Sequence, residues 1–268
     1  MGFMKILLIG DIVGKGGRRA VCDLVPQLRR EFDCGFCVAN GENMAGGGGI
    51  NRKCLEGMLK PGVVDVVTTG DHIWDQKDFV GEIASYPNVL RPANLPKEQP
   101  GNGWGIFTGP DGRSIGVISL LGRVFIHLQS DCPFRAADRA LAEILPKTKI
   151  VLVDFHAEAT SEKIAMGHHL DGRVTMVFGT HTHVPTADEQ ILPKGTALQC
   201  DLGMVGARDS ILGRAIAPVL KRFTTGMPSP FTVVETGIRL QGAVLELDPV
   251  TGRAKSVQRV MRDYPDLD

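Results

Sequence analysis

The chain has 268 residues, 43% of them hydrophobic, which is enough for one large core, and we expect a single domain over residues 1–268. Its 30 basic and 30 acidic side chains give a formal net charge of zero, so no basic excess is available for stable nucleic-acid binding. No apolar run reaches the ~20 residues that span a bilayer, and no signal-peptide pattern opens the sequence, so we expect no membrane association.

In chain order, apolar runs alternate with helical patterns, which is typical of an α/β fold. We expect strands over 5–9, 35–39, 63–69, 89–90 and 149–154, and in the run that begins at 174 and ends in Gly179. We expect helices over 17–32, 52–59, 76–85, 135–145 and 161–170, with Pro26 kinking or splitting the first. Hairpins are expected at 105–108 with 114–121, turning at Pro110-Asp111-Gly112, and within 190–198, turning at Pro193-Lys194-Gly195. A short segment near 213–223 and strands over 231–235 and 238–247 complete the pattern.

The six cysteines are scattered along a chain that is long enough to fold without disulfides, which predicts reduced thiols and a cytoplasmic location. Cys34 and Cys37 have the spacing of a redox motif. In such a motif the pair opens a helix, whereas Cys37 leads into the strand pattern Val38-Ala39-Asn40. We therefore interpret the two cysteines as the start of a half-buried strand.

Polar side chains that suit a metal follow five of the predicted strands, at the point where each strand ends. They are Asp11, Glu42 with Asn43, Asp71 with His72, His156, and His181 with His183. Each of them alone could be an ordinary turn or capping residue. In α/β sheets, however, ligands bind outside the carboxyl ends of the strands, so we expect these side chains to converge. The two histidines of His181-Thr182-His183 would point to one side in an extended chain.

The number and chemistry of these side chains predict a metal pair. Three or four side chains make one metal site, and eight candidates fit two adjacent ions bridged by a carboxylate. A mixed set of oxygen and imidazole nitrogen donors favours Fe, Mn or Zn over Mg or Ca, and it does not choose among those three metals.

Five motifs, in this order, resemble the YmdB-like family of calcineurin-type metallophosphoesterases. They are GDIVG, NGEN, GDHIWD, DFHAEATSEK and GTHTH, and the resemblance runs from residue 4 to about residue 247. It implies a four-layer α/β/β/α sandwich with a mixed central sheet, a dinuclear metal centre, and phosphodiesterase activity on small cyclic nucleotides, 2′,3′-cyclic and also 3′,5′-cyclic. It also implies a homo-oligomer, a dimer or a tetramer.

The resemblance assigns roles to the candidate residues. The first metal would be held by Asp11, Glu42, Asn43 and His183. The second would be held by Glu42, Asp71, His156 and His181, with Glu42 bridging the two and His72 beside the site as a catalytic residue. The family pattern is similar to Gly-Asn-His where this chain has Gly70-Asp71-His72, and the extra negative charge of Asp71 should bind metal more tightly and reduce its Lewis acidity.

The mechanism that we expect is attack of a metal-bridging hydroxide on the phosphorus of a small phosphodiester, with His72 protonating the leaving oxygen. Two alternatives stay open. One is a phosphomonoesterase or nucleotidase with the same dinuclear centre. The other is a regulatory protein with weak residual turnover, an alternative that the Asp71 departure keeps open.

Overall fold

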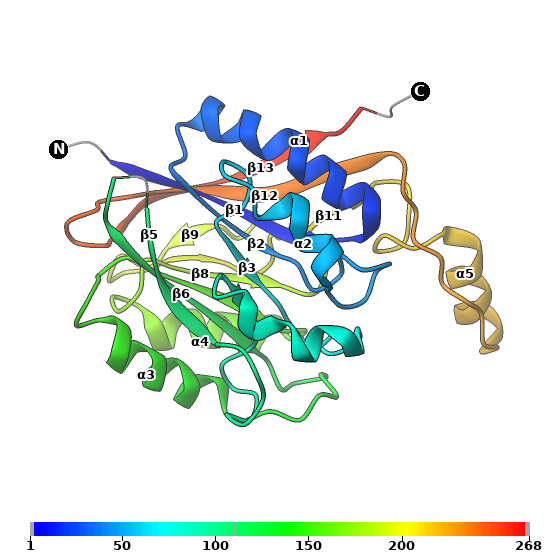
Figure 1. The fold of residues 1–268 in the computed structure, drawn as a ribbon, viewed down its shortest axis with the longest axis horizontal. Helices are drawn as coiled ribbons and strands as arrows, with labels where there is room; N and C mark the ends of the chain where they lie inside the picture. Colours follow the sequence, from blue (N-terminus) through cyan, green and yellow to red (C-terminus); the bar gives the residue numbers. More distant parts are fainter. Residues whose placement is uncertain (1–2, 110, 266–268) are drawn as a thin grey trace.

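The computed structural model describes residues 3–109 and 111–265, and two mixed β-sheets packed face to face form its centre (Figure 1). The first sheet has the order β13-β12-β11-β1-β2-β3-β4. Its strands are β1 (Met4–Ile12), β2 (Phe36–Asn40), β3 (Val66–Thr68), β4 (Val89–Leu90), β11 (Met204–Ala207), β12 (Ile238–Leu247) and β13 (Ala254–Asp263). The second sheet has the order β5-β6-β7-β8-β10-β9. Its strands are β5 (Trp104–Thr108), β6 (Ser114–Leu121), β7 (Val151–His156), β8 (Met176–Thr180), β9 (Gln190–Ile191) and β10 (Ala197–Gln199).

Four helices cover the outer faces of the sheets: α1 (Gly14–Phe32), α2 (Arg52–Met58), α3 (Pro133–Ile144) and α4 (Thr160–Leu170). The 3-10 helices η1 (Lys77–Gly81) and η2 (Ile83–Ser85) follow β3, and α5 (Ile216–Thr225) lies outside the sandwich. Figure 1 shows α1 on one side of the paired sheets and α3 and α4 on the other. The expected four-layer α/β/β/α sandwich is therefore confirmed. No helix within the described ranges is long and apolar enough to cross a membrane.

The alternation of side chains along β1 explains the layers. Leu7 and Ile9 are buried in the cluster that packs under α1 and α2, whereas Ile6 and Leu8 are buried in the cluster between the two sheets. Successive residues of a strand point to opposite faces, so a strand that is apolar on both faces must be covered on both. A third cluster lies between the second sheet and its helices, where Val153 and Phe155 of β7 meet Leu141 of α3.

Strand direction determines where the site lies. In the first sheet β1, β2, β3 and β4 run parallel, and in the second β6, β7, β8 and β10 do. Antiparallel pairings lie toward the borders: β12 pairs antiparallel with β1 and with the border strand β13 in the first sheet, and the border strands β5 and β9 pair antiparallel in the second. The carboxyl ends of β1, β2, β3, β7 and β8 consequently meet at one rim of the sandwich.

Several elements differ from the sequence-based expectation. Pro26 neither splits nor ends α1, because the buried face of Val21, Val25 and Leu28 holds the helix together across it. The expected helix over 76–85 forms the two short 3-10 helices instead, since only Phe79 and Ile83 are buried and they supply no continuous apolar stripe.

The C-terminal third departs further. Residues 231–235 form no strand; Val233 makes only an isolated bridge to Arg214. Strands β11 and β13 were not predicted. Strand β13 pairs with β12 alone in the sheet, and most of its side chains are at least partly exposed, so its sequence lacks the apolar run that indicates a buried strand.

Both expected hairpins form. β5 pairs antiparallel with β6 and β9 with β10. Pro110 of the first expected turn lies outside the described residues. Gly112 and Gly195, which follow in the two turns, have φ values of 79° and 99°, a left-handed backbone that glycine adopts without strain.

Candidate metal centre and active site

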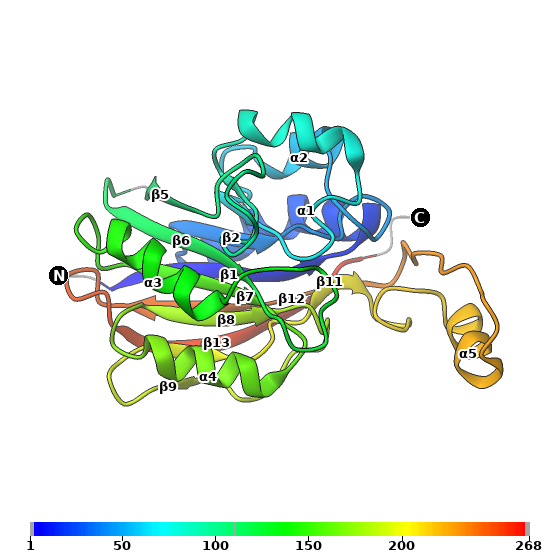
Figure 2. The ribbon, with the colours of Figure 1, turned by 90° about the horizontal axis from the view of Figure 1, so that it is seen from below.

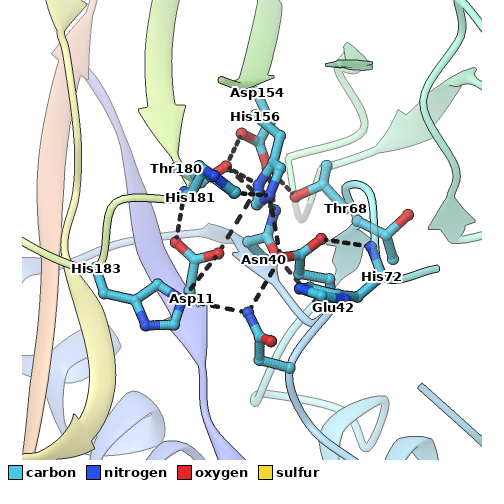
Figure 3. A network of polar contacts seen from close by, with 12 residues as sticks. Asp11, Asn40, Glu42, Thr68, His72, Asp154, His156, Thr180, His181 and His183 are labelled. Carbon is cyan, nitrogen blue, oxygen red and sulfur yellow. Dashed lines mark hydrogen bonds and ion pairs between the residues drawn. The ribbon is translucent and has the colours of Figure 1, made fainter. Parts of the chain in front are cut away.

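All eight candidate residues lie together at the shared rim, and both sheets contribute to the group. Figure 3 labels Asp11, Glu42, His72, His156, His181 and His183. The first sheet supplies Asp11 at the end of β1, Glu42 and Asn43 after β2, and Asp71 and His72 after β3. The second supplies His156, the last residue of β7, and His181 and His183 after β8. The predicted convergence of the strand ends is thus present in the structure.

One half of the group is centred on His156. Its Nε2 lies 3.0 Å from Oε1 of Glu42, 3.2 Å from Oδ1 of Asp71 and 3.0 Å from Nδ1 of His181. One ligand atom from each of these four residues lies within 4.8 Å of the others, which is the spacing of a group that could hold a metal ion. They are the four residues expected at the second metal.

The other half is centred on Asp11. Its Oδ2 accepts a hydrogen bond from the backbone N–H of His181 at 3.0 Å, which leaves Oδ1 facing the group. This Oδ1 is buried and has no hydrogen-bond partner among the described residues. Nε2 of His183 lies 3.9 Å from it, and the Asn43 amide lies 3.2 Å from the same histidine nitrogen.

An unpartnered buried carboxylate oxygen normally costs free energy, and a bound cation would offset that cost. Burial raises the pKa of Asp11 far above its ordinary value, and the neighbouring Asp201 and Glu42 charges raise it further, although His156 opposes them. His156 shows the complementary response. Burial lowers its pKa, but the carboxylates of Glu42, Asp71 and Asp11 outweigh burial and raise it well above the usual value. A cluster of buried carboxylates and imidazoles with this charge pattern fits bound metal cations.

Neutral imidazoles bind metal through the nitrogen that carries no proton, and the partner of the other nitrogen decides which one that is. Nδ1 of His156 lies 2.8 Å from Oγ1 of Thr180, which in turn donates to Asp154 at 2.7 Å. Nδ1 of His183 donates to the carbonyl oxygen of Leu212 at 3.3 Å. In both residues Nε2 is therefore the nitrogen that faces the group.

Asp154 was not singled out from the sequence, although it organises the support of the site. It is buried two residues before His156 on β7, so both side chains leave the strand on the same face. It accepts hydrogen bonds from Thr68, Thr180 and Asn40. The spacing of two residues within the DFH motif was the signal that could have revealed it.

The loop that carries His181 and His183 is not extended, which corrects the sequence-based expectation. His181 has a φ of 100° and His183 a φ of 63°, so both are in a left-handed backbone that side chains other than glycine rarely adopt. Such strain persists only where the surroundings hold it. Here Asp201 accepts from the backbone N–H of Thr182 at 3.1 Å and is itself paired with Lys163.

Glu158 is a second residue that the sequence-based prediction missed. Its Oε2 lies 3.2 Å from Nε2 of His181, and Nδ1 of the same ring faces the group. A carboxylate on the far nitrogen of a metal-binding histidine fixes the ring and its tautomer.

His72 lies at the edge of the group and faces a cavity. Its Nδ1 is 2.8 Å from Oδ2 of Asp75, its Nε2 is 4.0 Å from Oδ2 of Asp71, and its side chain is 42% exposed. Burial lowers the pKa of His72, but the charges of Glu42, Asp71 and Asp75 outweigh it and raise the pKa above its usual value. The cavity has a volume of about 360 Å³ and is also lined by Glu42, Asn43, His181 and His183. A phosphate ester in this cavity would contact His72 and also the cluster of proposed metal ligands, which we call the ligand cluster.

The four-layer sandwich and the acid–histidine cluster on its strand ends define the chain as a phosphoester hydrolase of the metallophosphoesterase type. The sequence model of the family described as "YmdB-like protein" matches residues 7–260, and the chain belongs to this family. Over 258 residues it is 44% identical to a Bacillus subtilis (strain 168) protein named 2′,3′-cyclic-nucleotide 2′-phosphodiesterase, and the match covers 96% of this chain and 97% of that protein.

Two crystal structures share the fold over almost the whole chain. A hypothetical protein from Thermus thermophilus has a TM-score of 0.90 and 40% identity, covering 98% of this chain and 100% of its own. A structure described as a novel phosphatase from Mycoplasma pneumoniae has a TM-score of 0.90 and 32% identity, covering 98% of this chain and 94% of its own.

Proposed function

We propose that this chain is a metal-dependent phosphodiesterase that hydrolyses small cyclic nucleotides, with 2′,3′-cyclic nucleotides as the first candidates and 3′,5′-cyclic nucleotides as the second. The observation that carries the proposal is the convergence of Glu42, Asp71 and His181 on Nε2 of His156, at 3.0 to 3.2 Å. The name of the Bacillus subtilis relative supports the substrate class.

The residues present fit a pair of metal ions. Asp11, Glu42, Asn43 and His183 would hold one, and Glu42, Asp71, His156 and His181 would hold the other. Oxygen and imidazole donors in this mixture favour Fe or Mn, with Zn as the alternative. When bound, such ions neutralise the charge of the phosphodiester and lower the pKa of a water toward neutrality, so that it can attack phosphorus.

The remaining chemistry belongs to the chain itself. Water adds to phosphorus, the bond to one ester oxygen breaks, and that oxygen needs a proton as it leaves. His72 faces the cavity and is the donor, while Asp75 holds its Nδ1 and so directs Nε2 toward the reacting phosphate. A positioned general acid contributes roughly 10²–10⁴-fold to the rate. The product is a nucleoside monophosphate, and His72 regains its proton from solvent.

Cytoplasmic location is part of the proposal, supported by the six cysteines, all of which are free thiols. No stable nucleic-acid or membrane partner is proposed. Assembly into a dimer or tetramer stays a prediction.

The test is a substrate panel at defined metal content. The protein is stripped with a chelator, reloaded separately with Mn, Fe or Zn, and assayed with 2′,3′-cyclic AMP, 3′,5′-cyclic AMP and 3′-AMP. We expect no turnover of the stripped protein and the highest kcat/KM with a cyclic diester. Faster hydrolysis of the monoester would reassign the chain as a phosphomonoesterase. Turnover that is the same with and without metal would contradict the metal-dependent mechanism.

A further inference from the structure

The cavity at the metal centre has a second wall, which is apolar and comes from a different part of the chain. Residues 208–237, between β11 and β12, leave the sandwich and carry α5 beyond its edge (Figures 1 and 2). We call this segment the arm. Leu212, Val219, Phe223 and Phe231 of the arm line the same cavity as His72 and His183. One continuous space therefore joins the ligand cluster to an aromatic and aliphatic surface.

The base of the arm is fixed to the sandwich. Arg214 bridges to Val233, and the backbone N–H of Ala215 donates to the carbonyl oxygen of Thr232 at 2.9 Å. The Arg214 guanidinium donates to the carbonyl oxygens of Gly46 and Gly47, in the glycine tract after β2. The carboxylate of Glu235 accepts from the backbone N–H groups of Lys15 and Gly16 at the start of α1.

These contacts hold the two ends of the arm beside the cluster of proposed metal ligands. The link to the site is direct, because the carbonyl oxygen of Leu212 accepts the hydrogen bond from Nδ1 of His183. Leu212 thus belongs to the apolar wall and also supports His183.

The rings of the wall suit a flat unsaturated ligand. Phe223 is 75% exposed, although it lines a cavity next to a polar cluster. Phe231 carries the guanidinium of Arg222 at 5.3 Å from its ring centroid, an arrangement that restrains the ring. Aromatic side chains beside a phosphate site bind nucleobases by stacking, which tolerates every base because each has a π-face. A cavity of about 360 Å³ is within the range of small-molecule sites.

We propose that Phe223 and Phe231 form a nucleobase subsite, so that the enzyme selects phosphodiesters of nucleotides over diesters that lack a base. This inference rests on the proposed phosphodiesterase function and adds the part of the substrate that the ligand cluster does not contact. Stacking area sets the preference, so purine nucleotides bind more tightly than pyrimidine nucleotides. A second copy of the chain is the competing occupant of this surface.

The experiment compares two substrates that differ only in the base: 2′,3′-cyclic AMP and the 2′,3′-cyclic phosphate of 1-O-methylribose. Wild type, Phe223→Ala, Phe231→Ala and the double variant are assayed with the same metal. We expect kcat/KM for the nucleotide to fall about tenfold in the double variant, through KM, while kcat/KM for the base-free diester changes less than about twofold. Phe223→Tyr keeps the ring, so it should retain the wild-type kcat/KM for the nucleotide. Phe3→Ala, an exposed phenylalanine beside Lys255, is the matched control.

A binding measurement keeps the subsite testable even if neither diester is hydrolysed. Ligand-observed NMR with adenosine, which has no phosphate, should show contact with the wild type and none with the double variant. If the wild type hydrolysed neither diester but bound adenosine, the proposed function would be overturned and the nucleobase subsite would be supported. Equal loss on both diesters, equal kcat/KM of the wild type for both, or absence of adenosine binding would overturn the subsite. A change of oligomeric state in the double variant with equal loss on both diesters would assign the surface to a second copy.

Discussion

Lys163 and Asp201 form a buried ion pair, with Nζ of the lysine 2.7 Å from Oδ2 of the aspartate, directly against the loop that carries His181 and His183. The same Oδ2 accepts from the backbone N–H of Thr182, and Oδ1 accepts from that of Gly203 at 2.9 Å. One carboxylate therefore holds a strained loop in place, and Lys163 supplies the charge that makes its burial tolerable.

Removing the lysine alone should be costly. Lys163→Met leaves Asp201 buried and unpaired, and we expect the free energy of unfolding to fall by about 3–5 kcal/mol in urea denaturation. The double variant Lys163→Met/Asp201→Asn removes the uncompensated charge and keeps an acceptor for Thr182, so it should recover part of that loss. If the single variant lost less than about 1 kcal/mol, the pair would have no structural role under the loop.

His72→Gln should separate proton donation from metal binding. The side chain faces the cavity and pairs with Asp75, and it lies outside the two proposed ligand sets. We expect kcat to fall about 10²–10⁴-fold with the metal content unchanged, as measured by mass spectrometry of the purified protein. His168→Gln, on the exposed surface of α4, is the matched control. Unchanged turnover in His72→Gln would remove this residue from the mechanism.

Asp71→Asn tests the one position where the chain departs from the family pattern. Burial raises the pKa of Asp71, but the close contacts with His156 and His181 outweigh burial and hold the pKa far below its usual range. The carboxylate is therefore fully charged, and asparagine keeps the ligand oxygen while removing the charge. We expect both metals to stay bound, with weaker affinity and with kcat equal to or above that of the wild type. A metal affinity and a kcat equal to those of the wild type would contradict a ligand role for Asp71, whereas loss of metal from the purified variant would show that the charge of Asp71 is required for binding.

Glu158→Gln should weaken metal binding although all the proposed metal ligands are left in place. Glu158 faces Nε2 of His181, the nitrogen opposite to the one in the ligand group. Such outer carboxylates are worth about 10–100-fold in metal affinity. We expect roughly a tenfold rise in the dissociation constant for Mn, measured by calorimetric titration of the stripped protein. Glu143→Gln, exposed on α3, should leave it unchanged, and an equal effect of both changes would contradict a specific role for Glu158.

The sequence was sufficient to place the ligand residues because they follow a rule of topology. Asp11, Glu42 and His156 end apolar runs, and parallel strands bring their ends to one rim whatever the loops do. The left-handed conformations of His181 and His183 could not be predicted, since they depend on Asp201, a residue 18 to 20 positions further along the chain.

Elements that depend on partners distant in sequence were also missed. Strand β13 has a largely polar pattern and exists because β12 offers it an open edge. Glu158 lies in the loop between β7 and α4, and only the position of His181 gives it a role. The apolar wall of the arm has no motif, because a cavity surface is built from scattered residues such as Leu212 and Phe231. Local sequence thus predicts the elements that bury a face, and tertiary contacts decide the rest.

The Cys34 and Cys37 pair should behave as buried, inert thiols. Burial raises the pKa of Cys34 from 9.0 to about 11 and raises that of Cys37 well above 9.0, and Cys37 lies inside β2. At pH 8 a thiol of pKa 11 is about 0.1% thiolate, and the thiolate is the reactive form. We expect neither cysteine to be alkylated by iodoacetamide at pH 8 in the native protein, and both to react in guanidinium, with mass spectrometry as the readout. The partly exposed Cys132 serves as the internal control. The folded chain and the unfolded chain both keep these thiol protons below about pH 9. As pH rises from about 9 to 11 the unfolded chain loses them first, so the free energy of unfolding falls over that range. Rapid native alkylation of Cys37, or a disulfide between the pair after mild oxidation, would contradict this assignment and reopen a redox role.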